Sequence, residues 1–428
     1  MNGLLIVGAF LALFALGFPV VIAIGLPCIV YVFLNGFPID LIAQRTLYAL
    51  DSFPLVAVPV FLFVGSLMNS AGISHHIYKF ADTATGRLPG GLAQVNIFGS
   101  LIFAGMSGSA LADIGGLGRI EIDAMRSRGF SGGFAAAVTS SSAIIGPVFP
   151  PSIPLIIYGT VTGVSVLQLL LGGIIPGLVC VLMLMIMTGV LATRRKYPRA
   201  ERLPTGAELW RDLKPALPAL LAPVILIAGM LAGFFTPTEI AAVTVFYTML
   251  VSAFYYRELT WEGLFRAAFE TIHASAGILL IVAVAALFGW ILSVEQVPQQ
   301  LTSGMLAIST NPYVLLLLVN LLLIVVGMFL DSTTAILVIA PIIAKPLVAA
   351  GVDPVHLGMV VVFNLMIGLL TPPMGLALYL VADIAKVPMK EVLREMLPYY
   401  IPLGITLLLI TYVPEITTWL PRLAIGGP

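Results

Sequence analysis

The chain has 428 residues, of which 60% are hydrophobic and only 9% are charged. That balance lies far outside the range of soluble globular domains and predicts an integral membrane protein whose main partner is the lipid bilayer. The 20 basic and 20 acidic residues cancel, so the charge gives no reason to expect a nucleic-acid partner.

Long apolar segments mark the expected spanning helices, because about 20 helical residues cross about 30 Å of hydrocarbon. In chain order we expect them at 2–17, 19–35, 54–71, 132–162, 166–192, 214–233, 236–256, 273–294, 355–384 and 397–420. The first pair is separated only by Gly17-Phe18-Pro19, so one long kinked helix is an alternative there. The sequence therefore predicts an all-α polytopic membrane protein.

Two further segments, 92–128 and 311–350, are apolar enough to enter the membrane but are interrupted by small and polar residues. We expect each of them to form a re-entrant helical hairpin. The amphipathic segments that precede them, 74–88 and 297–309, are expected to lie along the membrane interfaces as arms.

Basic residues set the expected orientation of the chain. The segment 193–215 holds seven of the 20 Lys and Arg residues, so we place the linker 193–213 in the cytoplasm. Counting ten spans from there puts both termini in the periplasm. The hairpin at 92–128 then enters from the cytoplasmic face and the hairpin at 311–350 from the periplasmic face.

The two halves of the chain resemble each other at an offset of 222 residues. This shift aligns Gly105-Met106 with Gly327-Met328, Gly129 with Gly351, Ile145-Gly146 with Ile367-Gly368, and Pro150-Pro151 with Pro372-Pro373. Five spans in each half invert the second copy relative to the first. We therefore predict two inverted repeats, 1–192 and 214–428, each with a hairpin and a broken helix.

The repeat pairs features that could bind ions. Each half has a polar turn, at 107–109 or 329–331, and a helix broken by a double proline, at 140–154 or 363–375. A double proline removes two backbone donors and frees carbonyl oxygens, which are tolerated in a membrane only where protein or a polar cavity surrounds them. Such oxygens, with serine, threonine or aspartate nearby, suit a desolvated sodium ion. Half-helix N-termini at the same breaks would face an anion.

Simpler interpretations exist for these residues. Small residues such as Ser107 and Ser109 often serve close helix packing, and Pro150-Pro151 could be a structural kink. Asp331 is the only Asp, Glu, Lys, Arg or His in the segment 313–342, although capping a helix is an alternative role for it. Gly105-Met106-Ser107-Gly108 also begins like a hydrolase nucleophile elbow, but residue 109 is serine where that motif needs glycine.

Together, these motifs resemble a known family. The stretches GMSGSALADIGGLG, RGFSGGFAAAVTSSSAIIGPVFPPSIP, FLDSTTAILVIAP and GLLTPPMG are similar to the large membrane subunit of tripartite ATP-independent periplasmic (TRAP) transporters. The resemblance implies a bacterial inner-membrane protein for sodium-coupled uptake of an organic acid. It also implies a periplasmic substrate-binding protein and a small four-helix membrane subunit as partners. In the implied elevator mechanism, the hairpins and broken helices slide against a scaffold of the remaining spans.

The resemblance also implies ligand residues. The first sodium site would use Ser107, Ser109 and carbonyls around Gly146, Val148 and Pro150. The second would use Asp331, Ser332, Thr334 and the backbone near Gly368, Thr371 and Met374. The substrate would lie near Ser140, Ser141, Ser142 and Asn364, and the first hairpin motif is similar to that of carriers of sialic acid or related sugar acids.

Two rival functions are weighed against this one. A stand-alone ion-coupled carboxylate carrier of the same architecture would need no binding protein. An intramembrane serine hydrolase would need a general base beside its nucleophile, and the two histidines near spans, His273 and His356, fall close to predicted helix ends. We therefore expect a transporter and no enzyme.

Overall fold

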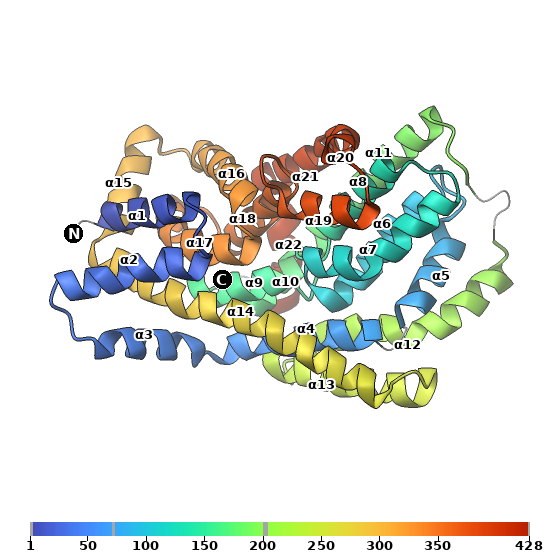
Figure 1. The fold of residues 1–428 in the computed structure, drawn as a ribbon, viewed down its shortest axis with the longest axis horizontal. Coiled ribbons are helices and arrows are strands. Elements are labelled where there is room, and N and C mark those ends of the chain that lie inside the picture. Colours follow the sequence, from blue (N-terminus) through green and yellow to red (C-terminus); the bar gives the residue numbers. More distant parts are fainter. Residues whose placement is uncertain (1–2, 71–72, 200–203, 427–428) are drawn as a thin grey trace.

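The computed structural model describes residues 3–70, 73–199 and 204–426, and the regular elements within these ranges are helices (Figure 1). Among the described residues, eight helical segments are long and apolar enough to cross a bilayer: Phe53–Ser70, Val166–Arg194, Gly206–Leu231, Pro237–Tyr256, Trp261–Val294, Pro312–Phe329, Ser332–Ala349 and Met389–Tyr412. The chain is thus a multi-pass membrane protein. This set lacks the two predicted broken helices, because each half of a broken helix is too short to cross alone, and it includes both helices of the predicted second hairpin.

The N-terminal segment forms two helices, α1 (Gly3–Ala15) and α2 (Val20–Leu34), so the alternative of one long helix is wrong. Within the described residues they have 13 and 15 residues and are not among the eight segments above, so their crossing of the bilayer stays a prediction. A third helix, α3 (Asp40–Leu50), was not predicted. It buries none of its side chains fully, and its apolar content is too low for a search based on hydrophobic length.

The first half continues through α4 (Phe53–Ser70), the amphipathic α5 (Ile73–Thr85) and a helical hairpin of α6 (Leu92–Ser107) and α7 (Ala110–Ser127). The predicted broken helix follows as α8 (Gly132–Ala143) and α9 (Ile153–Thr162), with the double proline between them. The next span consists of α10 (Val166–Gly172) and α11 (Ile174–Arg194), which meet at Gly173.

The predicted linker is shorter than expected. Helix α12 (Gly206–Leu231) begins inside the segment 193–213, because Thr205 and Glu208 form a capping box. It is followed by α13 (Pro237–Leu250), the π-helical turn η1 (Val251–Tyr256) and α14 (Trp261–Val294). With 34 residues, α14 starts well before the predicted 273 because Thr260 caps an additional polar segment.

The second half begins with α15 (Val297–Ile308) and the hairpin of α16 (Pro312–Phe329) and α17 (Ser332–Ala349). Its broken helix comprises α18 (Pro354–Leu369) and α19 (Leu376–Ala385). The predicted final span, 397–420, is wrong at both ends. The crossing runs through α20 (Met389–Met396), the 3-10 turn η2 (Leu397–Tyr399) and α21 (Tyr400–Tyr412), and α22 (Glu415–Ile425) is separate because Pro414 interrupts the helix.

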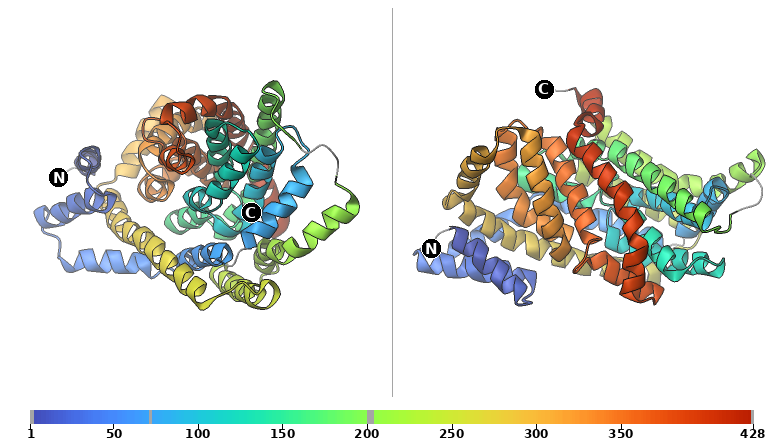
Figure 2. Two further views of the ribbon diagram at one scale, coloured as in Figure 1. Left: turned by 45° about the vertical axis from the view of Figure 1, so that its right-hand side comes forward. Right: turned by 90° about the horizontal axis from the view of Figure 1, so that it is seen from above.

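The hairpins and broken helices pack together, as Figures 1 and 2 show. Helices α6 and α7 contact α8, α16 contacts α18, and α17 contacts α9 across the two halves of the chain. Helix α14 packs against α2, α3 and α4 of the N-terminal part and against α17 of the second hairpin. The amphipathic α5 packs on α6 and α12, and α15 packs on α17. The core therefore places the two broken segments side by side.

Candidate functional site

A cavity of about 380 Å³ lies between the tips of the two hairpins, and we call it the tip cavity. Ser109 from the first hairpin and Asp331 and Ser332 from the second line it together. Its other lining residues are Leu62, Gly108, Ala110, Leu111, Ala112, Pro147, Ile153, Pro154, Ala274, Ile278, Thr333 and Leu369. The structure thus brings residues of both predicted cation sites to one cavity, although they are more than 200 positions apart in the chain.

The first hairpin turns at Gly108, which has a φ of +60°. A side chain there would be strained, and a methyl group would lie 2.6 Å from the Pro151 carbonyl oxygen. The tip therefore touches the double proline of its own half. Ser109 caps α7, and its hydroxyl oxygen accepts a 3.4 Å hydrogen bond from the Ala112 amide.

Asp113 adds a carboxylate to this tip that the sequence predictions missed. Its side chain is 5% exposed, and Oδ1 accepts a hydrogen bond from the Ser107 hydroxyl. Among the described residues, Oδ2 has no hydrogen-bond partner. A methyl group on Gly146 would lie 2.8 Å from Oδ2, so this oxygen faces the broken helix at a predicted ligand position. Ser107 and Gly146 therefore flank the buried carboxyl group of Asp113.

The other two predicted carbonyl ligands of the first half lie in different surroundings. A methyl group on Gly173 would lie 2.1 Å from the Val148 oxygen, and one on Gly105 would lie 3.9 Å from the Pro150 oxygen. The Val148 carbonyl thus lies against the start of α11, and the Pro150 carbonyl faces α6. Within this break, the Ser152 hydroxyl donates to the Pro147 carbonyl.

The second tip is built around Asp331, the N-cap of α17. Its Oδ2 accepts a 3.2 Å hydrogen bond from the Thr334 amide, and its Oδ1 accepts one from the Thr334 hydroxyl. The capping role anticipated for Asp331 is therefore present. The carboxylate can still accept another ligand, because each oxygen retains a further lone pair. Asp331 also lines the tip cavity.

The broken helix of the second half holds the remaining predicted sodium ligands. Gly368 lies in close contact with Gly327 of α16, since a methyl group on Gly368 would be 2.5 Å from the Gly327 Cα. The Thr371 hydroxyl donates to the Ile367 carbonyl at 2.7 Å, and the Met374 side chain is 46% exposed. The Gly375 amide donates to the Met328 carbonyl at 3.2 Å and ties the break to the hairpin.

The predicted substrate residues lie in buried networks and do not line the tip cavity. Ser140 and Ser141 donate to carbonyls of their own helix, those of Ala137 and Val138. The Ser142 hydroxyl donates to Asn96 Oδ1 at 2.7 Å. In the second half, Asn364 donates to Asn320 Oδ1 at 2.6 Å, and Asn320 donates to Thr411 at 2.9 Å. In each half, an asparagine on the first hairpin helix thus holds the broken helix.

Asn96 also holds a second buried carboxylate that sequence reasoning missed. Its Nδ2 donates to Glu121 Oε2 at 2.8 Å and to the Thr139 hydroxyl at 2.7 Å. Glu121 is 2% exposed, and it lines a small void together with Asp113, Ser100 and Thr139. The first hairpin is therefore more acidic inside than its sequence pattern suggested.

The hydrolase alternative needs a general base beside Ser107. The Ser107 hydroxyl donates to a carboxylate, while the two histidines considered as bases are engaged elsewhere. The His356 ring is 3.0 Å from the Thr417 hydroxyl, and the His273 ring is 3.3 Å from the Phe269 carbonyl. Within the described part of the chain, neither ring is hydrogen-bonded to Ser107.

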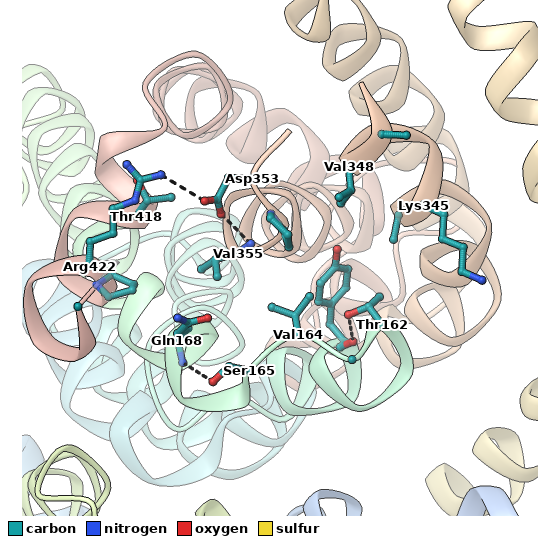
Figure 3. A pocket seen from close by; sticks show the side chains of 17 residues that line it. Thr162, Val164, Ser165, Gln168, Lys345, Val348, Asp353, Val355, Thr418 and Arg422 are labelled. Atoms are coloured by element: carbon teal, nitrogen blue, oxygen red, sulfur yellow. Dashed lines mark hydrogen bonds and ion pairs between the residues drawn. The ribbon is translucent and has the colours of Figure 1, made fainter. Parts of the chain in front are cut away.

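A larger cavity of about 670 Å³ lies between α9, α10, α17, α18 and α22 (Figure 3). Arg422 and Asp353 form an ion pair across it at 3.3 Å, and the Asp353 carboxylate also caps α18. This cavity contains none of the predicted ligand residues. We therefore take the tip cavity as the candidate site.

Comparison with known proteins points to one family. The family model described as "Tripartite ATP-independent periplasmic transporter, DctM component" matches residues 7–416. The sialic acid TRAP transporter large permease protein SiaM of Vibrio cholerae is 45% identical over 92% of this chain and 92% of its own length. The C4-dicarboxylate TRAP transporter large permease protein DctM of Rhodobacter capsulatus is 32% identical over 99% of both chains.

Two further similarities are to a longer relative and to a solved structure of low sequence identity. The sialic acid TRAP transporter permease protein SiaT of Haemophilus influenzae is 39% identical over 89% of this chain, which covers 62% of that longer protein. Among solved structures, the Alcanivorax borkumensis YdaH transporter matches with a TM-score of 0.60 and 17% identity, covering 90% of this chain and 89% of that one. At that identity the likeness concerns the fold alone.

Proposed function

Because the chain belongs to the tripartite ATP-independent periplasmic transporter family as its DctM component, we propose that it carries an organic acid into the cell, coupled to sodium. The observation that supports this most is the meeting of both hairpin tips at one cavity, with Asp113 beside the first tip and Asp331 at the second. A buried carboxylate such as Asp113, and a half-buried one such as Asp331, next to freed backbone carbonyls suit a hard monovalent cation, because the cation compensates charge that is costly to bury.

The first sodium ion is assigned to the Ser107 and Ser109 turn, with Asp113 and the backbone near Gly146. The second is assigned to Asp331, with Ser332, Thr334 and the broken helix around Gly368 and Thr371. In this assignment each ion joins a hairpin tip to the broken helix of the same half. Binding of sodium would then order both tips around the tip cavity.

The substrate is proposed to occupy the tip cavity. The first residues of α7, α9 and α17 line it, so three helix N-termini meet there. Their positive dipole ends favour a carboxylate. Among the organic acids we favour sialic acid or a related sugar acid, because the Vibrio cholerae relative at 45% identity is named for sialic acid.

The proposed assembly has three chains in the inner membrane and periplasm. A periplasmic binding protein delivers the acid, and a small four-helix membrane subunit supports this chain, which keeps both termini in the periplasm. Transport follows an elevator motion in which the hairpins and broken helices move against α14 and the other scaffold helices. A stand-alone carrier remains the second candidate, and it predicts uptake without the binding protein.

The test is uptake of radiolabelled N-acetylneuraminic acid into proteoliposomes that contain this chain and its small subunit. We expect uptake that requires both an inward sodium gradient and the binding protein. A matched set with potassium in place of sodium serves as the control for membrane potential. Uptake that is equal in the two salts would rule out sodium coupling, and uptake without the binding protein would favour the stand-alone carrier.

A further inference from the structure

Besides the tip cavity, helix α14 lines a second cavity, of about 600 Å³. Ala274 and Ile278 line the tip cavity, and the next residues on the same face of α14 line the second cavity: Val282, Ala285, Ala286 and Gly289. The spacing of three or four residues places all of them along one side of the helix. Most are small, which leaves room beside this face.

Helix α17 lines both cavities in the same way. Thr333 faces the tip cavity, and Leu337, Pro341 and Ala344 follow at the same helical spacing in the second cavity. Helix α9 contributes its first residues, Ile153 and Pro154, to one cavity and its last, 160–162, to the other. Three helices therefore run without interruption from one cavity to the next, and we call the second cavity the vestibule.

The vestibule carries more positive than negative side chains. Arg45 of α3 and Lys345 of α17 line it, and Asp51 is the acidic residue among its lining. The Arg45 guanidinium lies 5.3 Å from the centre of the Trp290 ring, which also faces the cavity. Lys345 also lines the larger cavity, where Figure 3 shows its amine directed away from the Asp353–Arg422 pair.

The other lining groups suit a hydroxylated ligand. Ser52, Thr160, Thr162 and Ser293 offer hydroxyl oxygens, and the Tyr48 and Trp290 rings offer flat apolar faces. Cations in a cleft with low-dielectric walls raise the local concentration of anions. The vestibule thus combines positive charge that suits a carboxylate with flat apolar surfaces that suit a sugar ring.

We propose that the vestibule is a carboxylate-binding relay site, in which Arg45 and Lys345 hold the anionic substrate before it enters the tip cavity. This inference rests on the proposed function, because it takes the transported substrate to be an organic acid. Arg45 belongs to α3 beside the scaffold helix α14, whereas Lys345 belongs to the hairpin. Movement of the hairpin would therefore separate the two cations and release the acid.

Cysteine labelling tests the charge of the vestibule without requiring transport. The native thiols, Cys28 and Cys180, are 0% and 1% exposed, so a Ser293→Cys variant supplies an accessible thiol at the vestibule. The chain and its small subunit in proteoliposomes are treated with an anionic and a cationic methanethiosulfonate reagent of similar size. We expect the anionic reagent to react faster. Adding Arg45→Gln and Lys345→Gln should lower the ratio of the two rates by roughly 5-fold or more.

The matched control is Arg266→Gln, which removes a cation 62% exposed at the opposite end of α14 and should leave the ratio unchanged. A ratio that is unchanged by the double neutralisation would overturn the proposal. Failure of both reagents to react would also overturn it, since that result means that lipid chains fill the vestibule.

Protection experiments then test the ligand. N-acetylneuraminic acid and succinate are each added during anionic labelling, with the methyl ester of N-acetylneuraminic acid as the uncharged control. We expect at least one acid to slow labelling in the parent and neither to do so in the doubly neutralised variant. Protection by succinate alone supports the relay site even where sialic acid uptake fails, which separates this inference from the substrate assignment. Equal protection by ester and acid would contradict carboxylate binding.

Discussion

At the scale of single residues, Asp113 has the most direct consequence for ion coupling. Its carboxylate is buried beside Ser107 and Gly146, and one of its oxygens has no partner among the described residues. Asp113→Asn keeps the shape but removes the charge. We expect it to raise the sodium concentration for half-maximal uptake roughly 5- to 150-fold, corresponding to about 1–3 kcal/mol. Sodium titrations of uptake measure this shift.

The control for Asp113 lies on the same helix. Asp123 is exposed, so Asp123→Asn removes the same charge from α7 without touching the tip. We expect its sodium curve to match that of the unchanged protein. If the sodium titrations of Asp113→Asn and the unchanged protein were the same, Asp113 would not be a ligand of the cation.

Asp331 gives a second prediction, because it both caps α17 and lines the tip cavity. Asparagine is also a good N-cap, so Asp331→Asn should leave the hairpin folded. The loss of charge should still raise the sodium requirement for uptake, on the same scale as Asp113→Asn. Size-exclusion chromatography checks folding, and the sodium titration checks affinity. A folded variant with an unaltered sodium curve would leave Asp331 with its capping role alone.

Patterns in the sequence predicted the hairpin turns but not all the hydrogen-bond partners of the side chains in the hairpins. Asp113 stands within the stretch GMSGSALADIGGLG, yet its bond to Ser107 depends on how α7 folds back from the turn. Asn96 and Glu121 are 25 positions apart and meet only in the packed hairpin. Buried polar side chains do not recur at a regular spacing in the sequence, as apolar ones do. Which of them form hydrogen bonds therefore depends on tertiary packing.

At the scale of elements, the second hairpin and its broken helix approach through two glycines. A methyl group on Gly368 would lie 2.5 Å from the Gly327 Cα, which is backbone and cannot rotate away. We expect Gly368→Ala to lower the free energy of unfolding by about 1–3 kcal/mol through overpacking. The apparent melting temperature of the purified protein in detergent reports this loss.

The matched control is Gly404→Ala in α21, where a methyl group would meet no atom within 4 Å. Since alanine is the better helix former, this variant should melt at the same or a slightly higher temperature. If Gly368→Ala were as stable as Gly404→Ala, the close approach of α16 and α18 would not be a constraint on the fold.

Some elements were predictable from the sequence and others were not. Apolar segments interrupted by Ser107-Gly108-Ser109 or by Asp331-Ser332 indicated the two hairpins, and those interrupted by double prolines indicated the two broken helices. The same search missed α3, whose apolar side chains are too few for a hydrophobic window. It also placed the start of α12 too late, although the Thr205 to Glu208 capping pattern is visible in the sequence. The length of an apolar segment thus locates a spanning helix, whereas capping residues show where its polar N-terminal turns start.

At the scale of the whole molecule, the predicted topology can be tested at the bases of the hairpins. Ser127 and Ala349 are exposed residues at the ends of α7 and α17. Inverted repeats place these ends on opposite faces, so an impermeant thiol reagent added to intact cells should label Ala349→Cys and not Ser127→Cys. Permeabilised cells, in which both should react, provide the control. Labelling of both in intact cells would contradict the inverted arrangement.

The elevator motion can be tested by linking the proposed moving unit to the proposed scaffold. Leu111 of the first hairpin and Ile278 of α14 line the same cavity, so cysteines there can be joined by a cleavable bifunctional reagent. If the hairpin slides along α14, this link should stop uptake, and cleavage should restore it. A link between Tyr158→Cys of α9 and Val348→Cys of α17, which also share a cavity, stays within the moving unit. Because both residues of that link belong to the moving unit, we expect uptake to persist. If both links blocked uptake equally, the proposal of a rigid moving unit would be contradicted.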